Sequence, residues 1–433
     1  MILIVVPPFM VLTFMNSSKQ VWGHFKYSEL SPSAHSSDYR AQLAMVLLIK
    51  LLFVPATVFL SALIILSYFT SVPYLSYSDL PYYGSYFWRI PKCDIYQGEW
   101  VPDADTPPQY TNETCSYIQE HQNCMKYGRP DLEFLRWRWQ PSRCDLPRFD
   151  ADKFFRLVGN KTLAFVGDSL ARNHMQSLLC LLSKVASPTE VTERTDPIKI
   201  MHYERYNFTL KIIWSPFLVR TEEPDNNSGV FKLYLDEPDG RWLSGVAGFD
   251  YVILSGANWF TRQSMFYERG QLVGGSFVAL NITSNLTLRY SHRMAFRTAL
   301  RAINNHGSVK AKVIVRTLSP MSHFEGGSWD KGGDCRRTQP YRSNETTMGD
   351  LDLDFYTGQV EEFREAEKAA AVAGVDMVLM DTTGAMLLRP DGHPSRYGHW
   401  PEEKRVLSND CIHWCLPGPV DAWNDMLLQI MSD

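Results

Sequence analysis

The chain has 433 residues, of which 45% are hydrophobic and 13% aromatic, enough for one large globular domain or two smaller ones. Its formal net charge is −4, with acidic and basic residues in near balance. This balance lacks the basic excess of nucleic-acid-binding proteins, so we expect no nucleic-acid partner.

The N-terminal part of the chain has the pattern of a membrane anchor. Residues 1–50 contain scattered serines and are predicted to form a largely unstructured cytosolic tail. Residues 51–69 carry no charge and are long enough to span a bilayer, although a buried soluble helix is the alternative. Arg40 and Lys50 precede this segment and no charge follows before Asp79, which predicts a cytosolic N-terminus. Residues 70–91 would then form a stem, and the rest of the chain would be lumenal.

Cysteines and glycosylation sequons agree with a lumenal, oxidising compartment. All eight cysteines follow the apolar segment, and their even number indicates four disulfides. Eight cysteines allow about 105 pairings, which the sequence does not separate. A compact arrangement would pair cysteines within 93–180 and connect Cys124 and Cys335 to Cys411 and Cys415. Sequons follow the apolar segment at Asn112, Asn160, Asn207, Asn226, Asn281, Asn285 and Asn344.

Two regions of different character follow the stem. Residues 92–148 are dense in Cys, Pro, Trp and Tyr, which predicts a loop-rich lobe held by disulfides. Residues 149–433 alternate strand and helix patterns, which predicts an α/β domain with a parallel sheet covered on both faces. The strands are expected at 162–166, 208–214, 230–235, 249–255, 312–317 and 376–381. The helices are expected at 150–158, 170–183, 290–304, 356–373 and 420–431.

One strand-to-helix turn has the pattern of a nucleophile site. Gly167-Asp168-Ser169 follows a buried strand and precedes an apolar helix, a geometry that presents a serine hydroxyl at the carboxyl edge of a sheet. The backbone N–H groups at the helix N-terminus could hold an oxyanion there. The alternative is that Ser169 only caps the helix. Asp168 is expected to brace the turn.

The C-terminal segment supplies the partners that such a serine needs. Asp410 and His413 are three residues apart, so a carboxylate and an imidazole can lie on one side of a turn. Ser169, His413 and Asp410 together provide a nucleophile, a general base and an orienting carboxylate. The alternative for this segment is a zinc site of Cys411, His413 and Cys415, but we expect no metal.

Residues near the other strand ends are candidates for binding an oxyanion or substrate. Gly256 and Asn258 follow the 249–255 strand and could donate a backbone N–H and a side-chain amide. Arg172 and Asn173 lie in the first turn after Ser169 and could fix the serine loop or reach the acyl group. His323 is a further candidate for binding substrate, with simple exposure as the alternative. Three tryptophans could stack on sugar rings, with core packing as the alternative: Trp137, Trp139 and Trp259.

Seven segments, in order from Cys93 onward, carry a resemblance to a known family. They are CDIYQGEWVPD (93–103), NCMKYGRPD (123–131), LRWRWQP (135–141), FVGDSLARNHMQSLLCLLS (165–183), HFEGGSWDKGGDC (323–335), LRPDGHPSRYG (388–398) and DCIHWCLPGPVDAWN (410–424). On these segments the chain resembles the plant trichome birefringence-like family, whose lumenal domain is related to GDSL/SGNH esterases (the PC-esterases). It is more similar to the branch implicated in xyloglucan and mannan O-acetylation than to the xylan branch.

The resemblance implies an SGNH-like three-layer α/β domain in a single-pass type II Golgi membrane protein. It implies transfer of acetyl groups to hydroxyls of a wall polysaccharide, with no cofactor apart from an acetyl donor. The family's Gly-Asp-Ser serine falls on Ser169, and its Asp-x-x-His pair falls on Asp410 and His413. The chain departs from many members at residues 274–278, where it has Gly-Gly-Ser-Phe-Val in place of Gly-Cys-x-x-Cys.

Three functions remain open from the residues. The same serine, histidine and aspartate could transfer acetyl groups through an acyl-enzyme, or could hydrolyse polysaccharide acetyl esters if water reached the acyl-enzyme first. A non-catalytic protein that binds wall polysaccharide through its aromatic lobe is the third alternative. The intact set of three residues argues against this last one.

Overall fold

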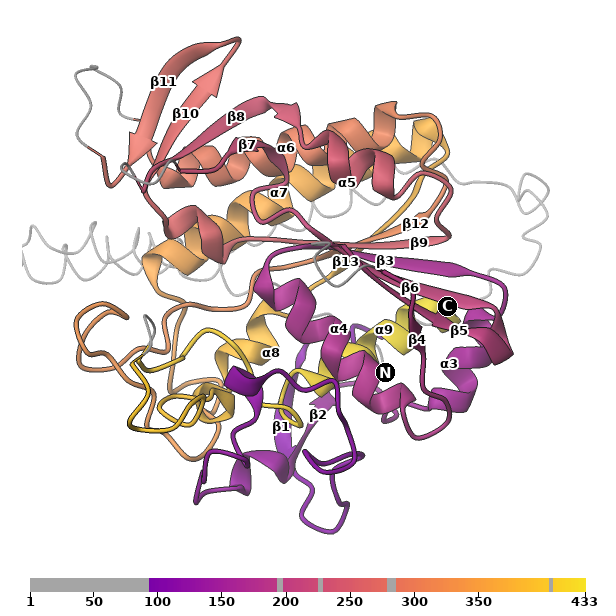
Figure 1. The fold of residues 1–433 in the computed structure, drawn as a ribbon, viewed down its shortest axis with the longest axis vertical. Helices are drawn as coiled ribbons and strands as arrows, with labels where there is room; N and C mark the ends of the chain where they lie inside the picture. Colours follow the sequence, from indigo (N-terminus) through magenta and orange to yellow (C-terminus); the bar gives the residue numbers. More distant parts are fainter. Residues whose placement is uncertain (1–92, 193–197, 225–228, 279–285, 405–407) are drawn as a thin grey trace, which may run out of the picture. The chain divides into compact units, whose positions relative to one another are not determined.

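The computed structural model describes residues 93–433, apart from 193–197, 225–228, 279–285 and 405–407 (Figure 1). The tail, the apolar segment and the stem predicted for residues 1–91 therefore lie outside the described residues. Within the described ranges, every helix is too short or too polar to cross a membrane.

The N-terminal lobe is a loop-rich unit around one strand pair. Strand β1 (Gly98–Pro102) pairs antiparallel with β2 (Trp137–Pro141), and two short 3₁₀ helices, η1 (Glu120–Gln122) and η2 (Glu133–Leu135), lie between them in sequence. Disulfides join Cys93 to Cys144 within the lobe and Cys115 to Cys180 in the next domain. The lobe therefore has the disulfide-held, helix-poor character that its composition predicts.

A seven-stranded sheet forms the centre of the larger domain. Its order is β13-β12-β9-β3-β6-β5-β4; the first five strands are parallel, whereas β5 pairs antiparallel with β6 and β4 pairs antiparallel with β5. The five parallel strands lie in the order 2-1-3-4-5 by their sequence, which is a doubly wound arrangement. The bounds are β3 (Thr162–Gly167), β4 (Thr189–Glu190), β5 (Lys199–Tyr203), β6 (Phe208–Trp214), β9 (Tyr251–Ser255), β12 (Lys312–Arg316) and β13 (Asp376–Met380).

Helices cover both faces of this sheet (Figure 1). Alternate residues of β3 enter two cores: Leu163 and Phe165 pack in one, Ala164 and Val166 in the other. Burial on both faces explains the continuous apolar runs of the parallel strands. The helices on one side are α3 (Ala151–Val158), α4 (Ser169–Leu182) and α9 (Asp421–Ser432). Those on the other side are α5 (Gly240–Gly245), α6 (Leu288–Asn305) and α7 (Asp350–Ala373).

A second, four-stranded sheet corrects the prediction of a single parallel sheet. The strand predicted at 230–235 is β8 (Phe231–Pro238), and it lies in a separate sheet of order β11-β10-β8-β7. Alternate residues along β8 are buried, as in a sheet that has only one covered face, and those buried residues share a core with residues of α6. The other strands are β7 (Val219–Glu222), β10 (Ser264–Glu268) and β11 (Gln271–Ser276), and β11 holds the Gly-Gly-Ser of the divergent segment.

One buried histidine of the fold makes its stability dependent on pH. His292 of α6 is buried, and its ring stacks on Phe355 of α7 with centroids 4.0 Å apart. Burial lowers the pKa of His292 to about 3. As the pH falls, the unfolded chain therefore takes up a proton at this residue well before the folded protein does, so stability is lost below about pH 6.5.

We expect His292→Phe to make the protein less sensitive to acid. The phenyl ring can keep the stacking on Phe355 but cannot take up a proton. For a single histidine with this shift, the loss of stability between pH 7 and pH 5 is about 2 kcal/mol. Between pH 7 and pH 5, the free energy of unfolding in urea should therefore fall by about 2 kcal/mol more in wild type than in the variant. An equal fall in both proteins would contradict the assignment.

Candidate active site

The candidate site lies where two neighbouring parallel strands lead to opposite faces of the sheet. β3 continues into α4 on one face, whereas the chain after β9 leads to α6 on the other. In open α/β sheets, ligands bind in the crevice at such a switch point, outside the carboxyl ends of the strands. Ser169, after β3, and the segment 256–258, after β9, both follow these strand ends.

The turn before Ser169 is fixed by a glycine and an aspartate. Gly167 has φ +153°, and a Cβ on it would lie 1.8 Å from the carbonyl oxygen of Ser255 in β9, so only glycine fits. Asp168 is buried and caps α4, because its Oδ1 accepts from the Leu170 N–H at 2.9 Å. Its Oδ2 accepts from the Ala257 N–H at 3.3 Å, so Asp168 also ties the turn to the β9 loop.

The structure brings Ser169, His413 and Asp410 into one hydrogen-bonded chain. His413 Nε2 lies 2.7 Å from Ser169 Oγ, and His413 Nδ1 lies 2.7 Å from Asp410 Oδ2. Asp410 Oδ1 also accepts the backbone N–H groups of Ile412 and His413, at 3.0 and 2.9 Å. Because a carboxylate only accepts, His413 carries its proton on Nδ1, and the free Nε2 can take the hydroxyl proton of Ser169.

The electrostatics of this chain favour an ionised carboxylate beside a basic imidazole. Burial alone would raise the pKa of Asp410, but the charge and hydrogen bonds of His413 outweigh it and hold this pKa well below its usual range. Burial alone would lower the pKa of His413, but the Asp410 charge and hydrogen bond raise it above its ordinary value. The arrangement suits general-base catalysis near neutral pH.

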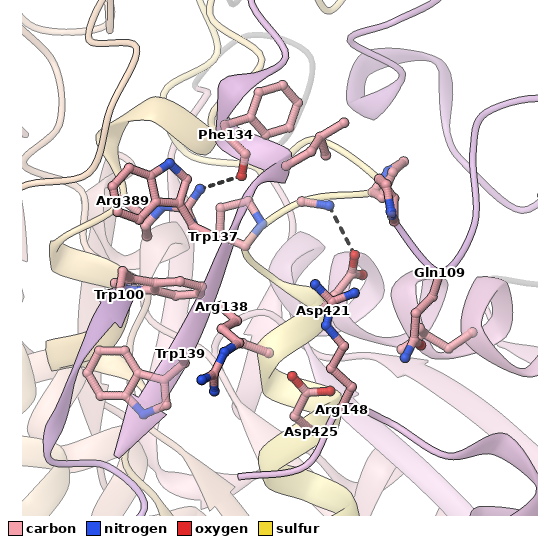
Figure 2. Close-up of a pocket in the computed structure, with 17 residues that line it drawn as sticks. Trp100, Gln109, Phe134, Trp137, Arg138, Trp139, Arg148, Arg389, Asp421 and Asp425 are labelled. Atoms are coloured by element: carbon pink, nitrogen blue, oxygen red, sulfur yellow. Dashed lines mark hydrogen bonds between the residues drawn. The ribbon is translucent and has the colours of Figure 1, made fainter. Parts of the chain in front are cut away.

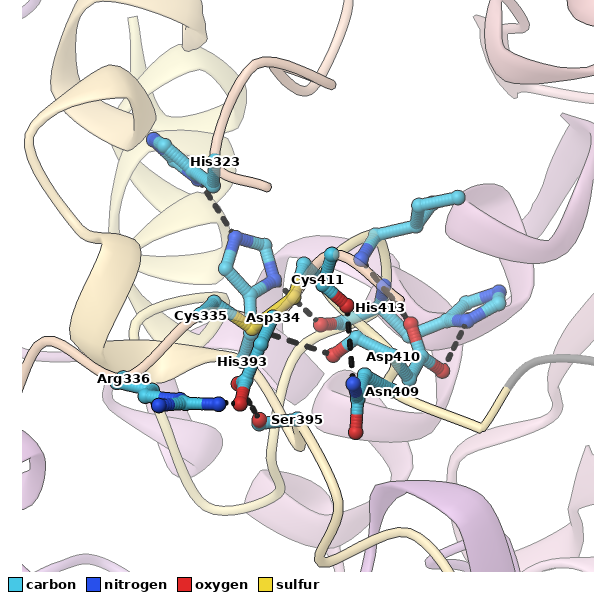
Figure 3. Close-up of a disulfide and its surroundings, with 12 residues drawn as sticks. His323, Asp334, Cys335, Arg336, His393, Ser395, Asn409, Asp410, Cys411 and His413 are labelled. Carbon is cyan, nitrogen blue, oxygen red and sulfur yellow. Dashed lines mark hydrogen bonds and ion pairs between the residues drawn. A yellow bond between two sulfur atoms is a disulfide. The ribbon is translucent and has the colours of Figure 1, made fainter. Parts of the chain in front are cut away.

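Disulfides lie on both sides of His413 in the candidate catalytic loop, residues 410–415; Figure 3 shows the one between Cys335 and Cys411. Cys411 bonds to Cys335, and Cys415 bonds to Cys124 of the N-terminal lobe. The predicted connection of Cys124 and Cys335 to this cysteine pair is confirmed. Because both loop cysteines are in disulfides, the alternative zinc site that included them is wrong.

Asn173 has a different role from the predicted contact with substrate. Its side chain is fully buried, its Oδ1 accepts from the Trp414 N–H at 2.8 Å, and its Nδ2 donates to the Trp414 carbonyl at 3.3 Å. Both ends of the amide are therefore bonded to the residue after His413. Asn173 fixes the catalytic loop against α4, and we withdraw its assignment to substrate binding.

The other predicted binding residues lie around the turn. Arg172 is half-buried, and its guanidinium lies 4.8 Å from the centre of the Trp214 ring. Gly256 directly follows β9, and its carbonyl accepts from the Gln359 side chain at 3.1 Å. Asn258 is 8% exposed, and its Nδ2 has no hydrogen-bond partner among the described residues. A buried N–H group without a partner is uncommon in proteins, so the Asn258 amide remains a candidate donor to a ligand.

His121 is a residue at the site that the sequence analysis missed. It lies on η1 of the N-terminal lobe, and its ring meets the His413 ring edge-on with centroids 4.9 Å apart. Nitrogen and oxygen atoms of His121, Asp410 and His413 lie within 4.8 Å of one another, a spacing that would allow metal binding. A metal there would compete for His413, whose two ring nitrogens already contact Asp410 and Ser169. The signal in the sequence that could have found His121 is its position three residues before Cys124, a cysteine predicted to connect to the loop of His413.

Trp137 and Trp139, the candidates for sugar stacking in the lobe, line a pocket whose walls include neither Ser169 nor His413 (Figure 2). The same pocket includes Leu181 of α4, which lies about 18 Å along the helix axis from Ser169 at 1.5 Å per residue. Trp139 is 3% exposed and donates its indole N–H to the Ile95 carbonyl at 2.8 Å, so it is a core residue. Neither tryptophan therefore lies beside the candidate nucleophile.

We expect Asn173→Ala to destabilise the protein and not to raise KM. The change leaves the buried N–H and carbonyl of Trp414 without partners, which costs about 2–4 kcal/mol in the free energy of unfolding. Urea unfolding measures this loss, and Arg172→Ala is the control because the described structure shows no hydrogen bond from the Arg172 side chain. A higher KM at unchanged stability would instead restore the role in substrate binding.

Comparison with known proteins places this geometry in a family. The PC-Esterase model, described as the GDSL/SGNH-like acyl-esterase family found in Pmr5 and Cas1p, matches residues 146–430, and the PMR5 N-terminal domain matches residues 91–145. The chain is 50% identical over 347 residues to trichome birefringence-like 19 of Arabidopsis thaliana, covering 78% of this chain and 81% of that protein.

Two named acetyltransferases are also similar. Xyloglucan O-acetyltransferase 4 of Populus trichocarpa is 44% identical over 345 residues, covering 78% of this chain and 81% of that protein. Xyloglucan O-acetyltransferase 1 of Arabidopsis thaliana is 40% identical over 347 residues, covering 79% and 80%. The chain therefore belongs to the GDSL/SGNH-like PC-Esterase family and, within it, to the trichome birefringence-like proteins.

Proposed function

We propose that this protein transfers acetyl groups to hydroxyls of a plant cell-wall polysaccharide, xyloglucan or mannan, through an acyl-enzyme on Ser169. The observation that carries the proposal is the hydrogen-bonded chain from Ser169 through His413 to Asp410. The names of the similar acetyltransferases support xyloglucan as the acceptor. No cofactor is required beyond an acetyl donor, which would be an ester or thioester.

The first half of the reaction acetylates the serine. Ser169 Oγ attacks the acetyl carbonyl carbon of the donor while its proton passes to His413 Nε2. Asp410 holds His413 with Nδ1 protonated and stabilises the imidazolium that forms. The tetrahedral intermediate then breaks its bond to the donor's leaving group, which takes the proton from His413. Acetyl-Ser169 and a neutral His413 remain.

The second half transfers the acetyl group to the sugar. An acceptor hydroxyl attacks the carbonyl carbon of acetyl-Ser169 and gives its proton to His413 Nε2. The new intermediate collapses by releasing Ser169 Oγ, which recovers the proton from His413. If water attacks in place of the sugar, the products are acetate and free enzyme, which is the esterase alternative.

The oxyanion of both intermediates would be stabilised by donors around the serine turn. Ser169 is the first residue of α4, a helix of 14 residues whose N-terminal N–H groups favour negative charge. Asn258 Nδ2, which is buried without a partner among the described residues, is a second donor, and the Gly256 N–H is a third candidate. Pre-oriented donors of this kind contribute about 3–4 kcal/mol each to stabilising the transition state.

A cavity beside the turn would bind the acceptor. Trp214 ends β6 and pairs in register with Gly167, two residues before Ser169. It lines a cavity of about 350 Å³ whose other walls include Arg220 and Asp239. Trp259 meets Trp214 edge-on at 5.1 Å and extends this aromatic surface. Aromatic faces with a few charged groups suit the apolar face and the hydroxyls of a sugar ring.

We also propose the lumenal Golgi location and the membrane anchor at residues 51–69. Four disulfides in the described part of the chain support an oxidising compartment. The proposed anchor would place the catalytic domain on the side where wall polysaccharides are acetylated.

Removing the nucleophile or the base should abolish transfer. We expect Ser169→Ala to give no acetylated product, and His413→Ala to lower kcat by about 10²–10⁴-fold because general-base assistance is lost. The secreted domain from about residue 82 is incubated with acetyl donors and deacetylated xyloglucan or mannan oligosaccharides. Mass spectrometry then measures acetyl addition.

Each outcome of this experiment decides between the functions. Acetyl addition that depends on Ser169 supports the transferase and identifies its acceptor. Serine-dependent release of acetate without acetylated sugar would make the protein an esterase. Equal glycan binding by wild type and Ser169→Ala, with no acetyl chemistry from any donor or acetylated glycan, would leave the non-catalytic binding protein.

Trp214→Ala should weaken acceptor binding. Loss of a stacking face costs about 1 kcal/mol, so we expect KM for the oligosaccharide to rise about fivefold. Hydrolysis of a small activated acetyl ester, which does not need the acceptor cavity, should change much less. Trp137→Ala, in the other pocket, is the matched control. A larger effect on KM from Trp137→Ala than from Trp214→Ala would place the acceptor in the pocket that Trp137 lines.

A further inference from the structure

Two buried histidines outside the triad form a chain that ends on the catalytic residue (Figure 3). His393 is 1% exposed, and its Nδ1 lies 2.7 Å from the carbonyl oxygen of His413. His393 Nε2 lies 2.6 Å from Nδ1 of His323, which is 5% exposed. His323 Nε2 lies 3.0 Å from the carbonyl oxygen of Leu387. The chain therefore runs from one carbonyl to another through two imidazole rings.

Counting protons and comparing the three contact distances assigns a direction to this chain. Both ends are carbonyl oxygens, which only accept, so three hydrogen bonds need three N–H groups. Two neutral imidazoles supply only two. The two shorter contacts, at 2.6 and 2.7 Å, take them: His323 Nδ1–H donates to His393 Nε2, and His393 Nδ1–H donates to the His413 carbonyl. The longer contact to Leu387 is left without a proton.

The position of the His393 ring is also determined by its neighbours. The ring stacks on Trp414 with centroids 4.0 Å apart at 24°, and Trp414 is itself bonded to Asn173. The carbonyl of His393 accepts from Arg129 of the N-terminal lobe at 2.7 Å. A donor held this firmly, aimed at the backbone of the catalytic histidine, limits the positions that His413 can adopt.

We propose that His393 is a positioning residue for His413, and that His323 fixes the tautomer in which His393 donates to the His413 carbonyl. This inference rests on the proposed function, because it concerns how the general base of that reaction is held. A hydrogen bond on one ring nitrogen decides the role of the other, so His323 acts on His413 through His393.

The charges around the pair agree with two neutral rings. Burial lowers the pKa of His323 to about 4, although Asp391 opposes this shift. Burial, the neighbouring His323 and Arg129 lower the pKa of His393 well below its usual value, and Asp410 opposes them. Both rings are therefore neutral at the pH at which His413 acts as a base.

Two variants at residue 393 separate positioning from packing. In His393→Asn the amide nitrogen takes the place of imidazole Nδ1 and can still donate to the His413 carbonyl. In His393→Gln the amide takes the place of Nε2, and that donor is lost. Both are neutral, both lose the stacking on Trp414, and both leave the triad residues in place. His323→Asn and His323→Gln make the same comparison for the bond between the two rings.

The readouts are the steady-state kinetics of 4-nitrophenyl acetate hydrolysis, the pH profile of kcat/KM, and the thermal midpoint of each variant. We expect His393→Gln to lower kcat about tenfold or more with KM within twofold, because small displacements of a catalytic group are costly. His393→Asn should restore kcat to within about threefold of wild type. The kcat of His323→Asn should likewise be higher than that of His323→Gln.

The pH profile is a readout that a packing role would not change. The raised pKa of His413 depends on Asp410, with Asp168 also raising it and Arg172 lowering it, while His121 lies beside both members of the pair. A displaced His413 loses part of its bond to Asp410, so its pKa falls towards the ordinary value. We therefore expect the acid limb of kcat/KM to move to lower pH in His393→Gln and to stay in place in His393→Asn.

The failure of this inference can be told from the failure of the proposed function. If wild type shows no Ser169-dependent hydrolysis, the proposed function has failed and the inference fails with it. If wild type is active and the Asn and Gln variants lose kcat equally, or lose it in proportion to their thermal midpoints, the positioning role alone is wrong. An acid limb that does not move in His393→Gln would also overturn it.

Discussion

The whole site depends on holding a short C-terminal loop against the first turn of α4. His413 and Ser169 are 244 residues apart in sequence, yet their side chains meet at 2.7 Å. Closing so long a loop costs conformational entropy, and this chain offsets that cost with covalent bonds. The disulfides of Cys411 and Cys415 lie two residues on either side of His413, and they anchor it to two different parts of the molecule. Cross-links over such separations mainly restrict the unfolded chain, by about 4–6 kcal/mol each in the chain-entropy model.

The N-terminal lobe therefore supports the proposed catalytic residues even though it supplies none of them. Cys124 bonds to Cys415, Arg129 donates to the carbonyl of His393, and His121 lies against the His413 ring. These three contacts come from within nine positions of the lobe; two reach residues 410–415, and the third reaches His393, whose ring contacts the His413 carbonyl. Asn173 of α4 also bonds to this loop, so the loop is supported by both domains that the family models recognise.

Sequence alone predicted the parts of this structure that depend on local pattern. Apolar runs and one alternating segment located the five parallel strands, and the Gly-Asp-Ser turn located Ser169, because a strand followed by a turn, a capping residue and a helix is a local pattern. The three-residue spacing of Asp410 and His413 correctly predicted their contact for the same reason. The second sheet was missed because an alternating strand does not say which sheet it joins. Asn173 was misassigned and His121 overlooked because their roles depend on contacts with residues more than 200 positions away, which no short pattern encodes.

The neutrality of the His323–His393 pair has a consequence for the chemistry. In the proposed reaction, His413 must be basic enough to take a proton from Ser169, yet must be neutral before it does so. Asp410 already raises its pKa, and a second carboxylate behind the loop would raise it further and leave the base protonated at neutral pH. A cation there would act in the opposite direction and weaken the base. A buried imidazole kept neutral by its surroundings can hold the His413 backbone through a hydrogen bond while leaving the charge balance between Asp410 and His413 almost unchanged. Position and basicity of the general base are then set by different residues.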